Sequence, residues 1–371
     1  MKFTASRSAL IEAFANAGSI VASRTIKPIL SNFHLVSQGD GMAEVRSTDL
    51  DISIRFRLPL ESHDGAGELV IPAQRTSAII KECATESITF ESDDSGKVKI
   101  RSGRASFQIL CENPAEFPTL PVFNEEAAFG LERSKLQALM AKTQFAVAKE
   151  KSRFAFNGAK LDIEGDVARM IATDGRRLAM MTVKIDNADQ VTASPIVPAR
   201  ALSLFEKVLT DADDVIRVAL DERQVMIKTA RAELAARLVE GQFPNYKAVI
   251  PTETPIRVEF DREELLRAFR QSSLLTSQET RSVRLRLQSG RATLTSQALD
   301  AGEATIELDA PDFGSDTEFA ISFNPDFVAD GLRVMESERV TICLSRPNHQ
   351  AKITGDTDFV YVIMPVTMRS A

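Results

Sequence analysis

The chain has 371 residues, of which 44% are hydrophobic and 26% charged, and its net charge is −7. This is typical of a soluble protein with two or three domains. No apolar stretch resembles a secretory signal or approaches the ~18 residues of a membrane-spanning helix. Cys83, Cys111 and Cys343 are too few and too far apart for a disulfide framework, which favours a reducing compartment. We therefore expect a cytoplasmic protein without a membrane partner.

A faint internal repeat, with a period of about 126 residues, sets the domain organisation. Residues 3–10 recur as 129–136 and again as 258–265, each with an Arg followed by a Leu that opens an amphipathic stretch. The Phe-Pro pair at 117–118 returns at 243–244. A unit of this length is a whole domain, so we expect three copies of one domain, over residues 1–124, 125–254 and 255–371.

Each copy is predicted to contain two helices and several short strands. Apolar residues at helical spacing predict helices, in chain order, over residues 4–24, 72–82, 131–153, 198–209, 261–275 and 325–336. Alternating stretches such as 97–101 predict half-buried strands, and Gly- and Asp-rich segments between them predict turns. The fold class is therefore α+β, as three copies of a two-helix, multi-strand domain.

The distribution of charge favours a polyanionic partner despite the acidic total. The six predicted helices hold 16 Lys and Arg residues against 11 Asp and Glu residues, so the excess of acid lies elsewhere. Such a protein is repelled from DNA everywhere except at one surface. The densest basic stretch contains Lys142, Lys149, Lys151 and Arg153, which a solvated helix face would explain equally well.

Several strings resemble those of the bacterial sliding clamp, the beta subunit of DNA polymerase III. They are the segments 3–4, 24–32, 172–179, 241–246 and 362–365, among which Ala-Thr-Asp-Gly-Arg-Arg-Leu-Ala and the near-terminal Met-Pro are the most specific. The resemblance implies a non-catalytic processivity factor of DNA replication. It also implies a head-to-tail homodimer that closes six domains into a ring around duplex DNA.

The resemblance further implies a pocket between the second and third domains that binds short peptides. Its expected partners are the DNA polymerase III alpha subunit, the clamp loader, other polymerases and repair proteins. The matching positions are Phe156, Thr173, Gly175, Arg176, Arg177, Leu178, Pro244, Val249, Asn348, Gln350, Val362, Ile363, Met364, Pro365 and Val366. The apolar members would form a socket for an anchoring side chain.

Two further sets of positions follow from the same resemblance. Those expected to contact DNA are Arg24, Arg75, Lys81, Lys149, Lys151, Arg153, Phe154 and Arg200. Those expected at the subunit interface are Phe107, Leu274 and Leu275, for which a place in the core is the alternative.

The chain departs from the family pattern in a few places. Ala155 replaces the second residue of an aromatic pair, Ala248 stands where a basic residue is common, and Arg176 stands where His is common. These changes predict a different peptide preference and bring into question the stacking on single-stranded template. The segment 367–371 extends beyond the usual end and would lie beside the pocket.

An enzyme and a scaffold are the competing interpretations. The three histidines are scattered, and the sequence has neither a zinc-binding motif nor a phosphate-binding Gly-rich loop. We therefore expect no catalysis, no metal and no cofactor. A non-catalytic repeated-domain scaffold without topological DNA binding remains the alternative.

Overall fold

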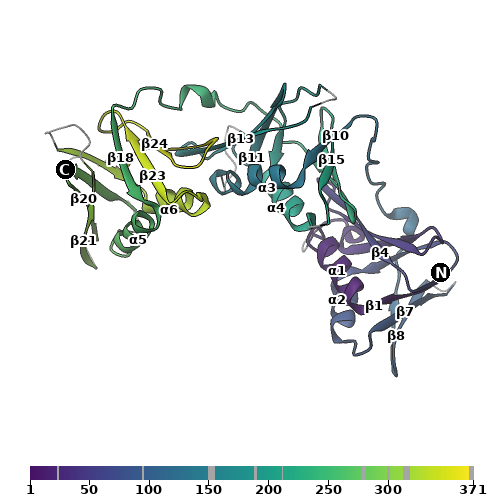
Figure 1. Ribbon diagram of the computed structural model, residues 1–371. Helices are drawn as coiled ribbons and strands as arrows, with labels where there is room; N and C mark the ends of the chain where they lie inside the picture. Colours follow the sequence, from purple (N-terminus) through teal and green to yellow (C-terminus); the bar gives the residue numbers. More distant parts are fainter. Residues whose placement is uncertain are drawn as a thin grey trace. The chain divides into compact units, whose positions relative to one another are not determined.

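The computed structural model describes residues 1–22, 25–93, 96–148, 155–187, 190–210, 212–277, 281–298, 301–311 and 318–366. Within these residues the chain forms six α-helices and 25 strands. It divides into two compact units, residues 1–133 with 200–238 and residues 134–199 with 239–371. The middle repeat thus contributes to both units (Figure 1).

Apart from the additional short strand β5 of the first repeat, the three repeats have the same order of strands and α-helices, each with two helices that follow a first and a later strand. The first repeat contains β1 (Lys2–Ser6), α1 (Arg7–Gly18), η1 (Pro28–Ser31), β2 (Asn32–Ser37), β3 (Met42–Thr48), β4 (Ile52–Pro59), β5 (Ser62–Asp64), β6 (Gly67–Pro72), α2 (Ala73–Glu82), β7 (Ser87–Ser92), β8 (Lys97–Ser102), β9 (Ala105–Leu110) and η2 (Pro114–Glu116). The second contains β10 (Ala128–Glu132), α3 (Arg133–Ala141), η3 (Gln144–Ala146), β11 (Gly158–Glu164), β12 (Val167–Thr173), β13 (Arg177–Lys184), β14 (Ile196–Pro198), α4 (Ala199–Val208), β15 (Val215–Leu220), β16 (Gln224–Lys228), β17 (Ala232–Arg237) and η4 (Tyr246–Ala248). The third contains β18 (Ile256–Asp261), α5 (Arg262–Ser273), β19 (Val283–Gln288), β20 (Arg291–Ala298), β21 (Gly302–Asp309), β22 (Phe319–Phe323), α6 (Pro325–Val334), β23 (Arg339–Leu344), β24 (Ala351–Thr354) and β25 (Phe359–Ile363).

Antiparallel sheets join neighbouring repeats. The first unit has a five-stranded sheet, β5-β1-β7-β8-β9, and an eight-stranded sheet, β10-β15-β16-β17-β4-β3-β2-β6. The second unit has an eight-stranded sheet, β14-β11-β12-β13-β25-β24-β23-β18, and a four-stranded sheet, β21-β20-β19-β22. Each eight-stranded sheet is therefore continuous across two repeats, through the pairs β17–β4 and β13–β25.

Local signals in the sequence explain where the helices begin. The Asp261 side chain caps α5 by accepting a hydrogen bond from the Glu264 backbone amide at 2.8 Å. The Asn324 side chain caps α6 and Pro325 occupies its first turn. Ser6 caps α1 in the same way, from the end of β1.

The helices of a repeat bury one face against its sheets. In the first repeat, α1 contacts α2, β3 and β4 (Figure 1). Phe14 of α1 stacks on Phe33 of β2 at 4.9 Å between ring centroids and meets Phe90 of β7 edge-on. All three rings are buried, which makes this aromatic cluster the centre of the repeat's core.

Two of the predicted helices are shorter in the structure. In the described part of the range 4–24, the helix covers Arg7–Gly18, because residues 4–6 continue β1. In the described part of the range 131–153, α3 ends at Ala141 and is followed by the short η3. The Thr143 hydroxyl donates to the Leu139 carbonyl at 2.6 Å, and its backbone at φ −128° leaves the helical region.

Lys142 does not belong to an exposed basic face. It is 7% exposed, and its Nζ lies 2.5 Å from Asp356 Oδ2 and 3.1 Å from Glu336 Oε1. It also donates to the Val334 carbonyl. The prediction that Lys142 contributes to a basic surface is therefore wrong, because its charge is neutralised inside the second unit.

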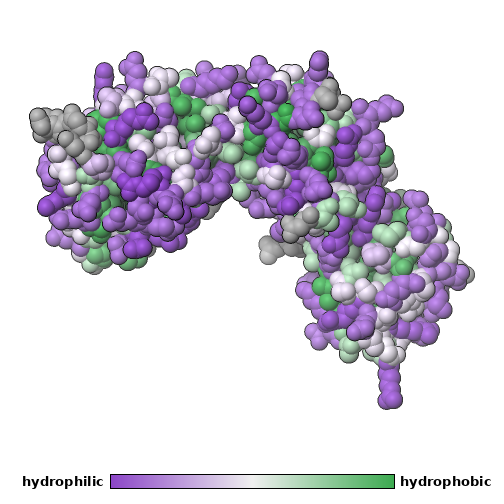
Figure 2. Space-filling model, in the orientation of Figure 1, coloured by the Kyte–Doolittle hydropathy of each residue, from purple (hydrophilic) through white to green (hydrophobic). Residues whose placement is uncertain are grey.

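Hydrophilic side chains dominate the face of the molecule that Figure 2 shows. Figure 2 shows hydrophobic residues only in small separate groups on the face that it presents. Among the described residues, Ile26, Val122, Leu274 and Leu110 are the most exposed large hydrophobic side chains. No helix in the described part of the chain is long and apolar enough to cross a membrane.

Candidate binding site

A tight turn between β12 and β13 forms one wall of the candidate socket. The Thr173 hydroxyl donates to the Arg177 carbonyl at 2.6 Å and accepts from the Gly175 amide at 3.1 Å. Asp174 Oδ1 accepts the amides of Arg176 and Arg177. Gly175 has φ +85°, a conformation that glycine adopts without strain. The Thr-Asp-Gly string is therefore a self-bonded turn that holds its neighbours in fixed positions.

Arg177 anchors this turn to the interior. Its guanidinium donates to Asp174 at 3.1 Å, to Asp330 of α6 at 2.7 Å and to the Phe145 carbonyl at 2.8 Å, and it lies 4.5 Å from the Phe327 ring centroid. Burial alone would lower the pKa of Arg177, but Tyr361, Asp330 and Asp174 outweigh it and raise the pKa. Because the side chain is 7% exposed and donates from Nε and from both terminal nitrogens, it supports the socket more than it contacts a ligand.

Apolar side chains surround a small cavity beside this turn. The cavity has a volume of about 130 Å³. Its lining residues are Phe156, Thr173, Gly175, Arg177, Leu178, Pro244, Tyr246, Val249, Val362 and Met364, which we call the socket. Leu178 and Val362 are cross-strand neighbours in β13 and β25 and form its buried floor, whereas Met364 is 39% exposed. The arrangement suits an apolar anchor of a partly flexible ligand.

Tyr246 is a socket residue that the sequence reasoning missed. Its hydroxyl donates to Asp162 Oδ2 at 3.0 Å, so the ring is held in place by β11. Burial and the hydrogen bond to Asp162 raise the pKa of Tyr246 to about 12, which keeps the phenol neutral. An aromatic residue two positions after the Phe243-Pro244 pair was the available signal.

The structure brings nine of the fifteen predicted pocket residues to the cavity. The six that do not line it are Arg176, Asn348, Gln350, Ile363, Pro365 and Val366. Ile363 is fully buried in β25, so it belongs to the core rather than to a contact surface. Gln350 donates from Nε2 to the Val249 carbonyl at 3.3 Å and supports the wall from behind. Val366 donates to the Ser322 carbonyl, which fixes the chain just beyond Pro365.

Only part of the predicted DNA-contacting set lies in the described chain. Arg75 and Lys81 are exposed on α2. Arg200 is half-exposed at the start of α4, where it pairs with Asp49 and donates to the Ile20 carbonyl at 3.3 Å. Outside the described residues lie Arg24, Lys149, Lys151, Arg153 and Phe154.

The predicted interface residues lie beside open sheet edges. Phe107 is half-buried on β9, the last strand of the five-stranded sheet. Leu274 and Leu275 follow α5, which contacts β21, the last strand of the four-stranded sheet. Leu274 is 79% exposed, so the alternative that it belongs to the core of a single copy is wrong.

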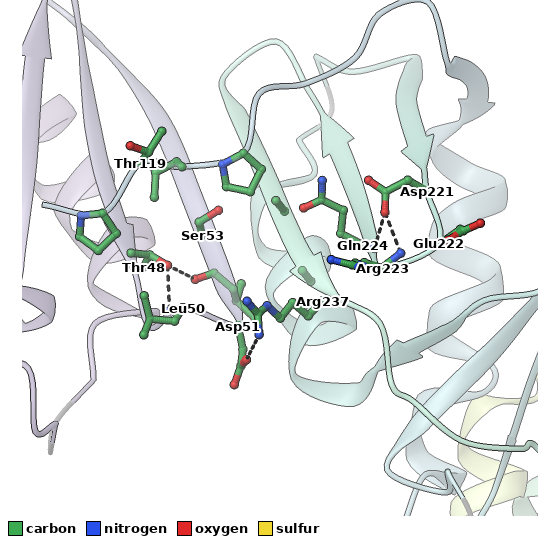
Figure 3. Close-up of a pocket in the computed structure, with 16 residues that line it drawn as sticks. Thr48, Leu50, Asp51, Ser53, Thr119, Asp221, Glu222, Arg223, Gln224 and Arg237 are labelled. Carbon is green, nitrogen blue, oxygen red and sulfur yellow. Dashed lines mark hydrogen bonds and ion pairs between the residues drawn. The ribbon is translucent and has the colours of Figure 1, made fainter.

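A second and larger cavity lies in the first unit. It has a volume of about 730 Å³ and is walled by the turn before β4, the segment 118–121 and the hairpin of β16 and β17 (Figure 3). We call it the cleft. Its side chains are mixed in character, with Leu50, Thr119, Arg223 and Arg237 among them.

The described residues contain no group of His, Cys, Asp and Glu that could hold a metal ion. The described residues thus form a thrice-repeated domain with sheet edges that are unpaired within them and with one small apolar cavity, the socket.

Comparisons with known proteins identify the family. Models of the N-terminal, central and C-terminal domains of the DNA polymerase III beta subunit match residues 1–121, 130–245 and 247–367. The beta sliding clamp of Pseudomonas putida is 30% identical over 99% of this chain and 100% of its own length. That of Chlamydia pneumoniae is 28% identical over 99% of both chains. The chain therefore belongs to the DNA polymerase III beta subunit family, the bacterial sliding clamps.

Solved structures agree with this assignment. The beta subunit from Pseudomonas aeruginosa superimposes with a TM-score of 0.93 at 29% identity, covering 99% of this chain and 100% of that one. The sliding clamp from Bacillus subtilis gives a TM-score of 0.93 at 26% identity, with full coverage of both chains. The three-domain α+β fold predicted from the repeats is confirmed.

Proposed function

We propose that this sliding clamp of DNA replication, which is not an enzyme, closes as a head-to-tail homodimer into a six-domain ring around duplex DNA. The observation that carries the proposal is a pairing rule inside the chain. The fourth strand of the first repeat, β4, pairs with the last strand of the second, β17. The fourth strand of the second repeat, β13, pairs with the last strand of the third, β25.

Applied to the third repeat, the same strand pairing predicts the contact between the two copies of the dimer. The fourth strand of the third repeat is β21, and the last strand of the first repeat is β9. Both are edge strands whose outer side is unpaired within the described residues. Pairing β21 with β9 of a second copy, twice, closes the ring and removes both open edges. Phe107 and Leu274 with Leu275 would then pack beside the new strand pair.

The basic residues of the helices would face the DNA. Arg75 and Lys81 on α2 and Arg200 on α4 are exposed, as weak phosphate contacts require. Arg24, Lys149, Lys151, Arg153 and Phe154 complete this set by their position in the sequence. Enclosure by the ring, rather than these contacts, would keep the protein on DNA while it slides.

The socket would bind short peptides from replication and repair proteins. Leu178, Val362 and Met364 offer an apolar anchor site, and a Pseudomonas aeruginosa clamp has been solved bound to griselimycin. By family membership, the partners would be the DNA polymerase III alpha subunit, the clamp loader, other polymerases and repair proteins. The protein would act in the bacterial cytoplasm, where the chromosome lies.

Retention on DNA before and after linearisation tests the ring. Labelled protein is loaded by its clamp loader and ATP onto nicked circular DNA, which is then cut with a restriction enzyme. We expect the protein to stay on circles and to leave linear DNA, because only a closed ring is held topologically. Equal retention on both forms would show ordinary surface binding and contradict the proposal.

A charge-reversal variant tests the DNA-facing residues in the same assay. Lys149, Lys151 and Arg153 changed together to Glu should reduce loading and the salt dependence of retention. Unchanged loading and unchanged salt dependence would show that these residues do not face the duplex.

A further inference from the structure

The cleft of the first unit is built like the socket, one repeat earlier. Its turn follows β3 as the socket turn follows β12, and the two turns share the same hydrogen bonds. The Thr48 hydroxyl donates to the Ile52 carbonyl at 2.9 Å and accepts the Leu50 amide at 2.9 Å. Asp49 Oδ1 accepts the amides of Asp51 and Ile52.

The opposite walls also correspond. Arg237 donates its amide to the Asp51 carbonyl at 2.9 Å, just as Met364 donates to the Arg176 carbonyl at 2.8 Å. The pairing of Ile52 with Ala236 likewise matches that of Arg177 with Ile363. By this register the cleft is the repeat-equivalent of the socket.

The residues of the cleft change its size and chemistry. In register, Ser53 replaces Leu178, Ala235 replaces Val362 and Arg237 replaces Met364. Smaller side chains on the floor explain why the cleft is wide where the socket is narrow. Its volume of about 730 Å³ lies within the 300–1,000 Å³ typical of ligand sites.

Leu50 indicates that the cleft has a function of its own and is not only a by-product of the repeated fold. It occupies the position of Gly175 in the turn and has φ +80°, which is unusual for a leucine. Its side chain is 42% exposed and lines the cleft, so burial in the core does not account for it. Strained residues of this kind gather at binding sites.

The cleft carries charges of both signs, with Arg223 and Arg237 beside Asp51, Asp221 and Glu222. Arg223 is exposed and attracts the Asp221 carboxylate, while Arg237 lies 3.9 Å from Asp51, with both side chains of that pair more than 70% exposed. Asp221 Oδ1 is occupied by the amides of Arg223 and Gln224. Glu222 points away from Arg237 in Figure 3. Both guanidinium groups are thus only weakly paired, because exposed ion pairs contribute little, and a ligand carboxylate can replace these partners beside the apolar edge that Leu50, Leu120 and the flanking prolines provide.

We propose that the cleft is a second peptide-binding site, specific for extended segments that combine acidic and large apolar side chains. Carboxylates of the ligand would pair with Arg223 and Arg237, and an apolar side chain would pack on Leu50 and Leu120. The inference from the socket rests on the proposed function of that site in peptide binding. The argument from Arg223 and Arg237 does not depend on that function.

Selection from a random display library of linear peptides tests this proposal. The target is the full-length protein with Met364 and Pro365 changed to Ala, so that the socket does not compete. We expect enriched sequences with acidic and large apolar residues. The corresponding synthetic peptides should bind the doubly reversed R223E/R237E protein at least about tenfold more weakly. Binding to R257E, which reverses an exposed arginine of β18, should be unchanged.

The other outcomes separate the two proposals. Failure to enrich any peptide, enrichment of basic peptides, or binding that R223E/R237E leaves unchanged would overturn the cleft as a peptide site. The socket would stand if the unaltered protein still enriched peptides that the Met364 and Pro365 changes remove. Thermal melting of each variant shows that the fold is kept, and L50G should weaken cleft binding without lowering the melting temperature.

Discussion

At the scale of single residues, one glycine allows a helix to pack closely against a strand. Gly331 of α6 has no space for a side chain, since an added Cβ would lie 2.2 Å from the Tyr361 ring. Tyr361 is fully buried and donates its hydroxyl to the Phe327 carbonyl at 2.7 Å, so it cannot move aside cheaply. Helix α6 therefore lies against β25 at a distance that only glycine permits.

Gly331→Ala should destabilise the protein. Alanine would favour the helix by up to about 1 kcal/mol, but overpacking against Tyr361 should cost about 1–3 kcal/mol or more. Urea unfolding measures the difference. Gly18→Ala is the matched control, because its Cβ would lie 3.6 Å from Phe33, an ordinary contact. Equal effects of the two changes would contradict the close packing of Gly331.

Leu50→Gly should stabilise the protein slightly. A leucine in the left-handed region costs roughly 1–2 kcal/mol, whereas glycine adds about 0.4–1 kcal/mol of unfolded-state entropy, so the expected net gain is about 0.5–1 kcal/mol. Leu50→Ala retains the strain and should show no gain. Thermal unfolding of the two variants compares them, and a gain for alanine equal to that for glycine would show that backbone strain is not the cause.

At the scale of elements, a buried ion pair links the end of α3 to the loop between β24 and β25. Asp356 accepts from Lys142, from the amides of Glu336 and Ser337 and from the Ser337 hydroxyl. Burial alone would raise the pKa of Asp356, but these hydrogen bonds lower it below its ordinary value. The carboxylate therefore holds together segments that are far apart in sequence.

Asp356→Asn should cost about 3 kcal/mol near neutral pH, because it leaves the Lys142 charge buried with a weaker partner. Since the folded-state pKa is lowered, the stabilisation is complete above the unfolded-state pKa of about 3.9 and is lost as pH falls through the folded value. Urea unfolding as a function of pH should show the difference between variant and parent shrinking below about pH 4.

Asp326→Asn is the control for the buried ion pair of Asp356 with Lys142, because it disrupts an exposed ion pair instead. Its partner Arg281 is 59% exposed, so the expected loss is at most about 1 kcal/mol. A loss as large as that of Asp356→Asn, or a loss for Asp356→Asn that does not change with pH, would contradict the assigned role.

The socket predicts a separation of peptide binding from assembly. Changing Met364 and Pro365 to Ala should abolish binding of clamp-binding peptides, chiefly through Met364, because truncating an anchor contact can cost 2 kcal/mol or more. The dimer should remain, since neither residue is close to β9 or β21 in the sheet order. Fluorescence anisotropy with a labelled polymerase peptide measures the affinity, and an unchanged affinity would remove the assignment of the socket.

At the scale of the whole molecule, the strand pairing that recurs between the repeats predicts how two copies of the chain assemble. Two of every three equivalent strand pairs form within one chain, and the proposed dimer would supply the third. It would pair the edges that β9 and β21 leave open within the described residues.

Leu274→Asp should convert the dimer to a monomer, because it places a charge beside the proposed β21–β9 contact. Sedimentation velocity measures the change. Val122→Asp is the matched control, since Val122 is also 79% exposed but follows Pro121, whose carbonyl accepts a hydrogen bond from Arg55 of β4 in the eight-stranded sheet, which contains neither β9 nor β21. A dimer that survives Leu274→Asp, or is lost equally with Val122→Asp, would contradict the interface.

The sequence by itself determined the three-repeat architecture, most helix starts and the Thr-Asp-Gly turn of the socket. These features depend on local chemistry, such as the caps at Asp261 and Asn324 and the alternation of polar and apolar residues in β8. The burial of Lys142 and the socket role of Tyr246 were decided only by the tertiary structure, because their partners Asp356 and Asp162 lie on separate elements. The same holds for the cleft, whose width comes from small residues on β4 and β17, strands of different repeats. Helix caps, turns and strand alternation depend on residues that are close in sequence, so the sequence alone predicts them. The shape of a cavity depends on which side chains from distant parts of the chain come into contact, so it is decided by the tertiary structure.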